Sequence, residues 1–197
     1  SLAIAGEDGT IIIWDVEARV IERRINNTLN DRVLTTYGLD FNNAGTRLIT
    51  GTDDNAVRIC DVATGEVILE MLGHNNWVWS VQYDPTEAAI ISADDDGVLF
   101  FWNAQDGTAL VDPIATNSSI YDVSLSFDGG FMATAGADGV IIIWSLAEQL
   151  GIVATIDAHR DIIWDVEFSP NDYHLLSASN DGNMLLSQLT AIPRPGT

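Results

Sequence analysis

The chain has 197 residues, 47% of them hydrophobic, and a formal net charge of −21 because 29 acidic side chains face 8 basic ones, all arginine. This composition excludes a disordered chain and allows one good core. A surface this negative repels phosphate backbones and anionic lipids. We therefore expect no binding to nucleic acid or membranes, and we expect basic partners. The absence of lysine excludes a Schiff-base lysine and a Walker-type phosphate loop.

Several further features concern the compartment and the extent of the chain. The single Cys60 makes no intrachain disulfide, which gives no sign of an oxidising compartment, and we interpret it as a small buried side chain. No apolar run approaches the roughly 18 residues of a membrane span, and no signal sequence is recognisable. We therefore expect a cytoplasmic protein. The start at Ser1 rather than Met suggests a fragment or a trimmed chain.

An aspartate recurs five times, at spacings of 46, 42, 42 and 43 residues: Asp8, Asp54, Asp96, Asp138 and Asp181. Six residues after each aspartate comes Trp14, Cys60, Trp102, Trp144 or Ser187. A period near 42 indicates one supersecondary unit copied along the chain, which cannot bury its apolar faces alone.

Each repeat reads as short strands separated by turns. In the third one, strands are expected at 78–84, 88–93, 98–102 and 108–111, with a tight turn at Asp95-Asp96-Gly97, because Asp-Gly between apolar runs is a strong hairpin signal. In chain order we expect three strands and a loop in 1–30, four strands each in 31–72, 73–115 and 116–156, three in 157–191, and a loose tail at 192–197. That makes 18 strands, with a longer polar loop at 26–31 and at most one helical turn, at 146–150.

These units resemble WD repeats over nearly the whole chain. The resemblance rests on three motifs: the GlyHis start at Gly73-His74, the turn Phe168-Ser169-Pro170, and the Trp-Asp end at Trp14-Asp15. It implies an all-β fold, a β-propeller whose blades are four-stranded antiparallel sheets around a channel. Because the family commonly has seven blades and seven periods exceed 197 residues, we expect part of a larger, about seven-bladed ring, or a ring completed by a partner.

The same resemblance implies a structural hydrogen-bond tetrad inside a blade. The third repeat supplies all of it, with His74, Ser92, Asp96 and Trp102. The fifth has His159, Ser177 and Asp181 but Ser187 in place of the tryptophan, and the second and fourth have Arg32 and Thr116 where the histidine would be. We interpret these histidines as structural rather than as metal ligands or catalytic groups.

The first strands break the two-residue period of a strand. Counting back from Phe41, Tyr83, Leu125 and Phe168, the residues expected to face inward recur at −2 and −5, so one extra residue must be absorbed as a β-bulge. The residue at −4 then lies out of phase with the core, and it is aromatic in all four repeats: Tyr37, Trp79, Tyr121 and Trp164. We call these four the aromatic bulge residues.

In WD repeats this column and two neighbouring positions tend to line the top face around the channel mouth. The resemblance therefore adds further candidates: Trp77, Ile162, Glu7, Asp53, Asp95 and Asn180. Aromatic rings among carboxylates suit a basic or cationic peptide, through cation–π contact and charge pairing. The alternative is that these aromatics simply pack between blades.

The predicted function is a non-catalytic protein–protein interaction module, a scaffold or sensing propeller whose partner is a basic protein or the remainder of a larger propeller. No nucleophile elbow, dinucleotide-binding glycine pattern or Cys-x-x-Cys occurs, and we assign no catalytic residue, metal or cofactor. The alternative is a small-ligand-binding or enzymatic propeller with its site at the channel mouth, which would need clustered groups with perturbed pKa values.

Overall fold

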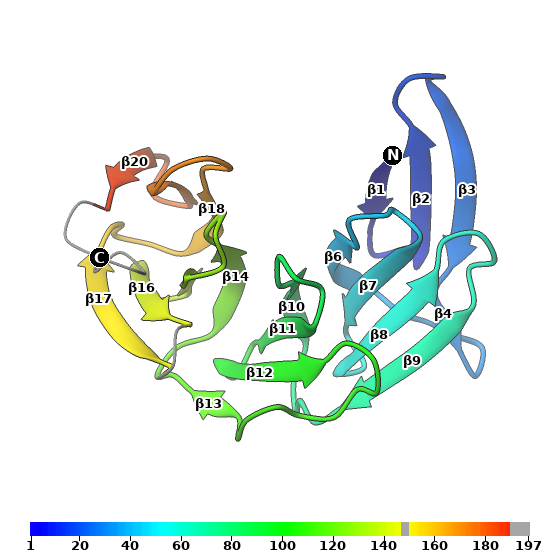
Figure 1. Cartoon of the computed structure of the whole chain (residues 1–197), viewed down its shortest axis with the longest axis horizontal. Coiled ribbons are helices and arrows are strands. Elements are labelled where there is room, and N and C mark those ends of the chain that lie inside the picture. The colour runs from blue at the N-terminus through cyan, green and yellow to red at the C-terminus, as the bar shows by residue number, and fades with distance from the viewer. Residues whose placement is uncertain (147–149, 190–197) are drawn as a thin grey trace. The chain divides into compact units, whose positions relative to one another are not determined.

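A computed structural model describes residues 1–146 and 150–189. The described residues form strands and turns only, which confirms the all-β prediction, and no helix among them could cross a membrane (Figure 1). Residues 147–149 of the expected helical turn and the expected tail at 192–197 lie outside this part of the chain.

Five sheets of three or four strands follow one another along the chain, each ordered by sequence, in addition to one two-stranded hairpin. Sheet I comprises β1 (Leu2–Ala5), β2 (Thr10–Asp15) and β3 (Val20–Asn26). Sheet II comprises β6 (Thr36–Phe41), β7 (Arg47–Thr52), β8 (Ala56–Asp61) and β9 (Val67–Leu72). Sheet III comprises β10 (Val78–Tyr83), β11 (Ala89–Asp94), β12 (Val98–Asn103) and β13 (Ile114–Ala115). Sheet IV comprises β14 (Ile120–Leu125), β15 (Phe131–Gly136), β16 (Val140–Ser145) and β17 (Gly151–Asp157). Sheet V comprises β18 (Ile163–Phe168), β19 (His174–Ser179) and β20 (Met184–Gln188).

The polar loop predicted at 26–31 contains a small hairpin of its own. Strand β4 (Thr28–Leu29) pairs with β5 (Arg32–Val33), so the described chain has two strands beyond the 18 expected. Asn30 and Asp31 between them have φ values of 49° and 64°, the left-handed backbone that both central residues of a tight hairpin turn adopt. The predicted loop is thus partly ordered by backbone pairing.

The fourth strand of sheet III was predicted at 108–111 and forms later, at Ile114–Ala115. Residues 108–111 make a short contact with β12, consisting of a bridge between Ala109 and Trp102 and hydrogen bonds from Leu110 N to Phe101 O and from Asn103 N to Thr108 O, each at 2.7 Å. Pro113 has no N–H to donate to a ladder, and it separates this short contact from the strand. The prediction was therefore wrong in position, although the number of strands in the sheet is correct.

The predicted Asp-Gly turns connect the second and third strands of the sheets. In sheet IV, Asp138 Oδ1 accepts a hydrogen bond from Val140 N at 3.0 Å, and Gly139 adopts φ +74°. A Cβ on Gly139 would lie 2.5 Å from the carbonyl oxygen of His159, so this turn requires glycine for both its backbone and its close packing.

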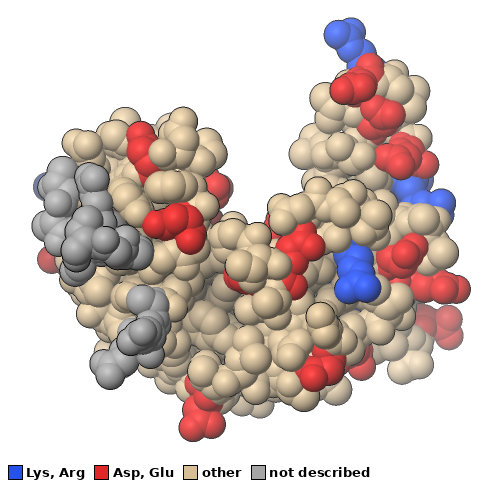
Figure 2. Space-filling view, viewed as in Figure 1, with Lys and Arg blue, Asp and Glu red and all other residues tan. Residues whose placement is uncertain are grey.

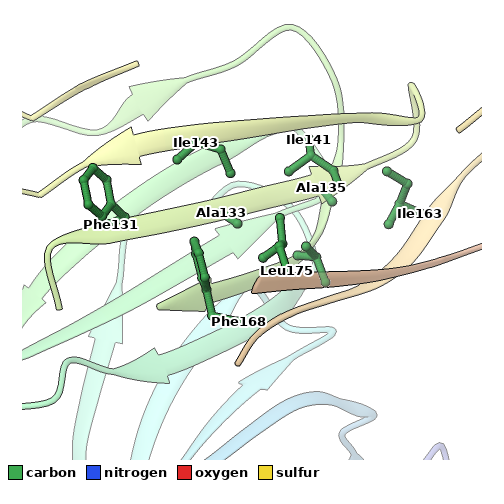
Figure 3. Close-up of a cluster of buried hydrophobic side chains, with 9 residues drawn as sticks. Phe131, Ala133, Ala135, Ile141, Ile143, Ile163, Phe168 and Leu175 are labelled. Atoms are coloured by element: carbon green, nitrogen blue, oxygen red, sulfur yellow. The ribbon is translucent and has the colours of Figure 1, made fainter. Parts of the chain in front are cut away.

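The chain divides into two compact units: unit 1 contains residues 1–94 and 99–114, and unit 2 contains residues 95–98 and those from 115 onward. In unit 2 the facing sides of sheets IV and V form an apolar cluster (Figure 3) built from Phe131, Ala133, Ala135, Ile141, Ile143, Ile163, Val166, Phe168 and Leu175. In unit 1 a second cluster joins sheets I and II, built from Ile11, Ile13, Ile25, Leu48 and Val62. Sheets IV and V, and likewise sheets I and II, thus bury apolar side chains jointly, as the repeat pattern predicts.

Side chains of the first strands also join neighbouring sheets by hydrogen bonds to backbone. In unit 2, Asp122 Oδ2 accepts from Val166 N and Ser124 Oγ accepts from Phe168 N, each at 2.9 Å. In unit 1, Asp40 Oδ2 accepts from Tyr83 N at 2.9 Å. These bonds hold first strands β14 and β18, and likewise β6 and β10, side by side.

Candidate functional site

Each of the four complete first strands contains a β-bulge at the residue that the sequence predicts. In sheet III the register passes from Val78↔Asp94 directly to Ser80↔Ala93, so Trp79 has no opposite residue on β11. The same shift skips Tyr37 in β6, Tyr121 in β14 and Trp164 in β18. The bulge prediction is confirmed at all four aromatic bulge residues.

The bulge separates the core side of each strand from the aromatic column. The residue just before each bulge is at most 5% exposed: Thr36, Val78, Ile120 and Ile163. The aromatic residue that follows is half-buried or exposed in every case. One inserted residue therefore turns these rings away from the apolar core while their backbone stays in the strand.

Unit 1 gathers three of the predicted aromatic residues into one cluster. The ring centroids of Tyr37 and Trp79 lie 4.2 Å apart, and those of Tyr37 and Trp77 lie 5.7 Å apart with a stacked orientation. Trp77 and Trp79 meet edge to face at 6.2 Å. Trp77 is 44% exposed, so the cluster presents an aromatic surface to solvent as well as packing on itself.

Unit 2 brings together the other two aromatic bulge residues. Tyr121 on β14 and Trp164 on β18 are stacked with centroids 5.0 Å apart and ring planes inclined by 21°. Trp164 is 49% exposed. Within each unit the rings are thus only partly used for packing between sheets.

The predicted acidic candidates have different surroundings. Asp53 is not an isolated negative charge, because Arg32 Nη2 lies 3.0 Å from its Oδ2 and Thr35 N donates to its Oδ1 at 3.2 Å. Glu7 is exposed, and Asp95 is half-buried with its carbonyl oxygen accepting from Ser119 Oγ at 2.6 Å. The Arg32–Asp53 pair was not foreseen, although Arg32 occupies the position at which other repeats have histidine.

Two other predicted candidates sit together in unit 2. Asn180 Nδ2 donates to Asp161 Oδ2 at 2.9 Å, and the carbonyl of Ile162 accepts from Ser179 Oγ at 2.8 Å. Asp161 is exposed, and the sequence interpretation missed it. Over the face of the molecule drawn in Figure 2, acidic side chains are widely scattered and arginines are fewer.

The structural tetrad of sheet III is present, with one correction. His74 Nε2 lies 2.6 Å from Ser92 Oγ, and Trp102 Nε1 donates to the same oxygen at 2.8 Å. The carboxylate 2.7 Å from His74 Nδ1 belongs to Asp94. The prediction assigned this role to Asp96, but Asp96 is exposed in the tight turn, whereas the last residue of β11 is fully buried beside the ring.

Sheet V keeps the predicted arrangement without its tryptophan. His159 Nε2 lies 2.8 Å from Ser177 Oγ, and His159 Nδ1 lies 3.1 Å from Asp181 Oδ2. The backbone N–H of Arg160, together with the N–H of Asn183 and the His159 ring, lowers the pKa of Asp181 to about 2. The carboxylate is therefore held ionised by local donors, as a structural group would be.

Sheet II replaces the tetrad with a buried arginine that the sequence interpretation did not single out. Arg58, only 3% exposed, donates Nη1 and Nη2 to the two oxygens of Asp54 at 3.0 and 2.6 Å, and donates Nε to Glu70 at 2.8 Å. Burial pushes the pKa of Asp54 upward, but hydrogen bonds from Arg58 and Thr52 outweigh it and leave that pKa below its ordinary value. The signal available in the sequence was an arginine in the middle of a strand, between the apolar residues Val57 and Ile59.

Three further groups in the packing of unit 1 have raised pKa values. Burial raises the pKa of Cys60 to about 11 and that of Tyr83 to about 12, and it raises the pKa of Asp40 although Tyr83 N donates to this carboxylate. Cys60 is buried and unpaired, which confirms its interpretation as a small core side chain. Among the described residues no group of three or more His, Cys, Asp and Glu side chains has metal-binding geometry.

A comparison with family sequence models finds four matches to the "WD domain, G-beta repeat", at residues 28–61, 65–103, 112–145 and 151–186. Together they cover more than half of the chain. The chain belongs to the WD-repeat family. The last three repeats each begin with the outer strand of one sheet and continue through the first three strands of the next, as β9 with β10–β12 illustrates. A repeat therefore links two neighbouring sheets covalently.

Among curated proteins, the WD-repeat chain is similar to "Denticleless protein homolog A" of Xenopus laevis, with 27% identity over 89 residues, 45% of this chain and 12% of that protein. It is similar to "WD repeat-containing protein 91 homolog" of Dictyostelium discoideum, with 31% identity over 41% of this chain and 10% of that protein. "Lissencephaly-1 homolog" of Heterostelium pallidum is 40% identical over 24% of this chain and 11% of its own length. Each alignment thus spans only about a tenth of the relative's length.

Proposed function

We propose that this WD-repeat chain is a non-catalytic protein-interaction module that binds a basic partner segment through its aromatic bulge residues and the acidic side chains near them. The observation that carries the proposal is the bulge in four successive first strands, which places an aromatic residue outside the core each time. A residue needed only for packing between sheets would keep the two-residue period of the strand and remain buried.

The partly exposed rings support this proposal in each unit. Trp77 and Trp164 are 44% and 49% exposed, and exposed tryptophans are the side chains most enriched among anchors of protein interfaces. Each is preorganised by stacking on a tyrosine, Tyr37 or Tyr121. Ordered rings lose little conformational freedom when a partner binds, which favours affinity.

Charge gives the chemistry of the partner. In the described part of unit 2, Arg160 is the one Lys or Arg side chain, against Asp and Glu side chains spread over its surface. Two of these acids, Asp161 and Asp165, flank Trp164 closely in sequence and are exposed. An aromatic face among carboxylates attracts Lys and Arg side chains through both cation–π contact and charge pairing.

The experiment is a titration of the chain with a Lys- and Arg-rich peptide and with an acidic peptide of equal length, followed by tryptophan fluorescence at two salt concentrations. The basic peptide is expected to change the fluorescence saturably and to bind more weakly at high salt. Asp95→Asn should mainly slow association and weaken its salt dependence. Equal responses to the two peptides, or none to either, would contradict the proposed basic partner.

A further inference from the structure

Sheet IV lacks the imidazole that completes the network of sheets III and V, because Thr116 stands where those sheets have His74 and His159. The hydroxyl of Thr116 does not reach into the sheet. It donates instead to backbone carbonyl oxygens, with Gly97 O and Ser118 O both 2.9 Å away. The side chain of Thr116 is therefore shorter than the histidine of sheets III and V and points to the backbone instead of filling this part of the sheet.

A cavity of about 300 Å³ opens at this place in unit 2. It is about ten times the volume of one water molecule in the liquid. Among its lining residues are Thr116, Ile120, Thr134, Asp138, Ile142 and Thr155. Thr134 occupies the position in sheet IV that Ser92 and Ser177 occupy in sheets III and V, and Asp138 occupies the position of Asp181. The cavity therefore retains both residues that contact an imidazole in sheet V.

The polar groups of the cavity are also arranged as they are around His159. Thr134 Oγ1 accepts a hydrogen bond from Trp144 Nε1 at 3.0 Å, as Ser92 Oγ does from Trp102 Nε1, which leaves its own O–H to donate. Asp138 uses Oδ1 to accept from Val140 N, just as Asp181 uses Oδ1 to accept from Asn183 N and Oδ2 to contact the ring. The carboxylate of Asp138 is thus oriented by the same turn.

We propose that this cavity of sheet IV is a binding site for an imidazole group, with one ring nitrogen on Thr134 Oγ1 and the other on the Asp138 carboxylate. Thr134 is 2% exposed, and Ile120 and Ile142 supply apolar walls against which a flat ring can pack. A neutral imidazole has one donor and one acceptor nitrogen, which match a carboxylate and a hydroxyl. The group can come from a free imidazole compound or from a histidine side chain of a bound protein.

The test uses the ¹H–¹⁵N resonance of the Trp144 indole, because its partner Thr134 Oγ1 is the atom that the ligand would contact. Imidazole is titrated at about pH 8.5, where the free ring is neutral and charge attraction to the acidic chain is absent. A saturable shift of the Trp144 resonance is expected, while the Trp102 resonance stays unchanged because His74 already fills the equivalent place. A parallel titration with N-acetyl-histidinamide distinguishes the two sources. A shift with both ligands shows that a histidine side chain fits the site, and a shift with imidazole alone restricts the site to a free compound.

Three variants make the assignment specific. Thr116→His should fill the cavity and abolish the response to imidazole, and Asp138→Asn should weaken binding by about tenfold or more, since a hydrogen bond to a charged group is lost. His159→Thr should open the equivalent cavity in sheet V and give the chain a second imidazole site. The proposal is overturned if the Trp144 resonance does not shift saturably in the unmodified chain, or if Thr116→His responds as the unmodified chain does.

Discussion

Arg58 and Asp54 form a two-point ion pair inside sheet II, with Nη1 3.0 Å from Oδ1 and Nη2 2.6 Å from Oδ2. A second acid, Glu70, lies 2.8 Å from the same guanidinium. Sheet II therefore holds its polar network with an arginine of its third strand, whereas sheets III and V use a histidine that precedes their first strand. Cys60, at the position of the repeat tryptophan, is too small to reach this network and is packed as an apolar residue.

Replacing this arginine should be costly. Arg58→Met is expected to lower the free energy of unfolding by about 2–4 kcal/mol, because Asp54 and Thr52 lose their buried partner. Chemical denaturation measures the loss. The double variant Arg58→Met with Asp54→Asn should recover part of it, because the stranded charge is removed, and a double variant no more stable than Arg58→Met would contradict the ion-pair account.

His74 is expected to contribute stability and not binding. His74→Ala should cost roughly 1–3 kcal/mol, because the buried Asp94 carboxylate and Ser92 hydroxyl each lose a hydrogen-bond partner. The affinity per folded molecule for a basic peptide should be unchanged, since the side chain of His74 is fully buried. Unchanged stability together with lost peptide binding would reverse this assignment.

Asp181 should make the free energy of unfolding decrease at acidic pH. Its pKa is lowered to about 2 in the folded chain from an ordinary 3.8, so its contribution is complete above the unfolded value and is lost as pH falls through the folded one. The stability difference between the unmodified chain and Asp181→Asn should therefore be constant from neutral pH down to about 5 and shrink between about pH 4 and pH 2. Denaturant unfolding at a series of pH values measures it, and a difference that shrinks at neutral pH would speak against the role of this carboxylate.

Exposed apolar side chains on β1 and β20, the edge strands of the first and last sheets, should cause copies of the chain to associate. Met184 and Leu186 on β20 are 67% and 71% exposed, and Leu2 and Ile4 on β1 are each 50% exposed. An edge strand with apolar side chains invites pairing with another chain. We expect concentration-dependent association in sedimentation velocity, reduced by Met184→Lys with Leu186→Lys. A monodisperse monomer at high concentration would contradict this expectation.

Features that recur from repeat to repeat could be predicted from the sequence, whereas features present in a single repeat were missed. Four repeats carry the same break in strand period, so the bulges at Tyr37, Trp79, Tyr121 and Trp164 could be located by alignment alone. The Arg58 network has no counterpart in the other repeats, so no comparison between repeats could reveal it. The expectation that sheets continue into a ring of about seven remains a prediction.

Two other misses have local physical causes. Asp94 was overlooked as the partner of His74 because the repeat spacing is counted from the tight-turn aspartate, whereas burial selects the residue that ends β11. The fourth strand of sheet III was misplaced because residues 108–111 fit a strand, yet they make only a short contact with β12, and Pro113, which has no N–H, separates this contact from the strand at residues 114–115.

The affinity of aromatic variants for a basic peptide measures most directly whether the aromatic bulge residues contact a basic partner. Trp79→Ala and Trp164→Ala should each weaken binding, by about 2 kcal/mol or more where the ring is a central anchor. Phe127→Ala is the matched control, because Phe127 is 45% exposed but lies in a turn and contacts Tyr173 rather than the bulge residues. The expected result is a loss of affinity in the two tryptophan variants and none in the control. Folded Trp79→Ala and Trp164→Ala proteins that bind as tightly as the unmodified chain would contradict it and assign these rings to packing between sheets.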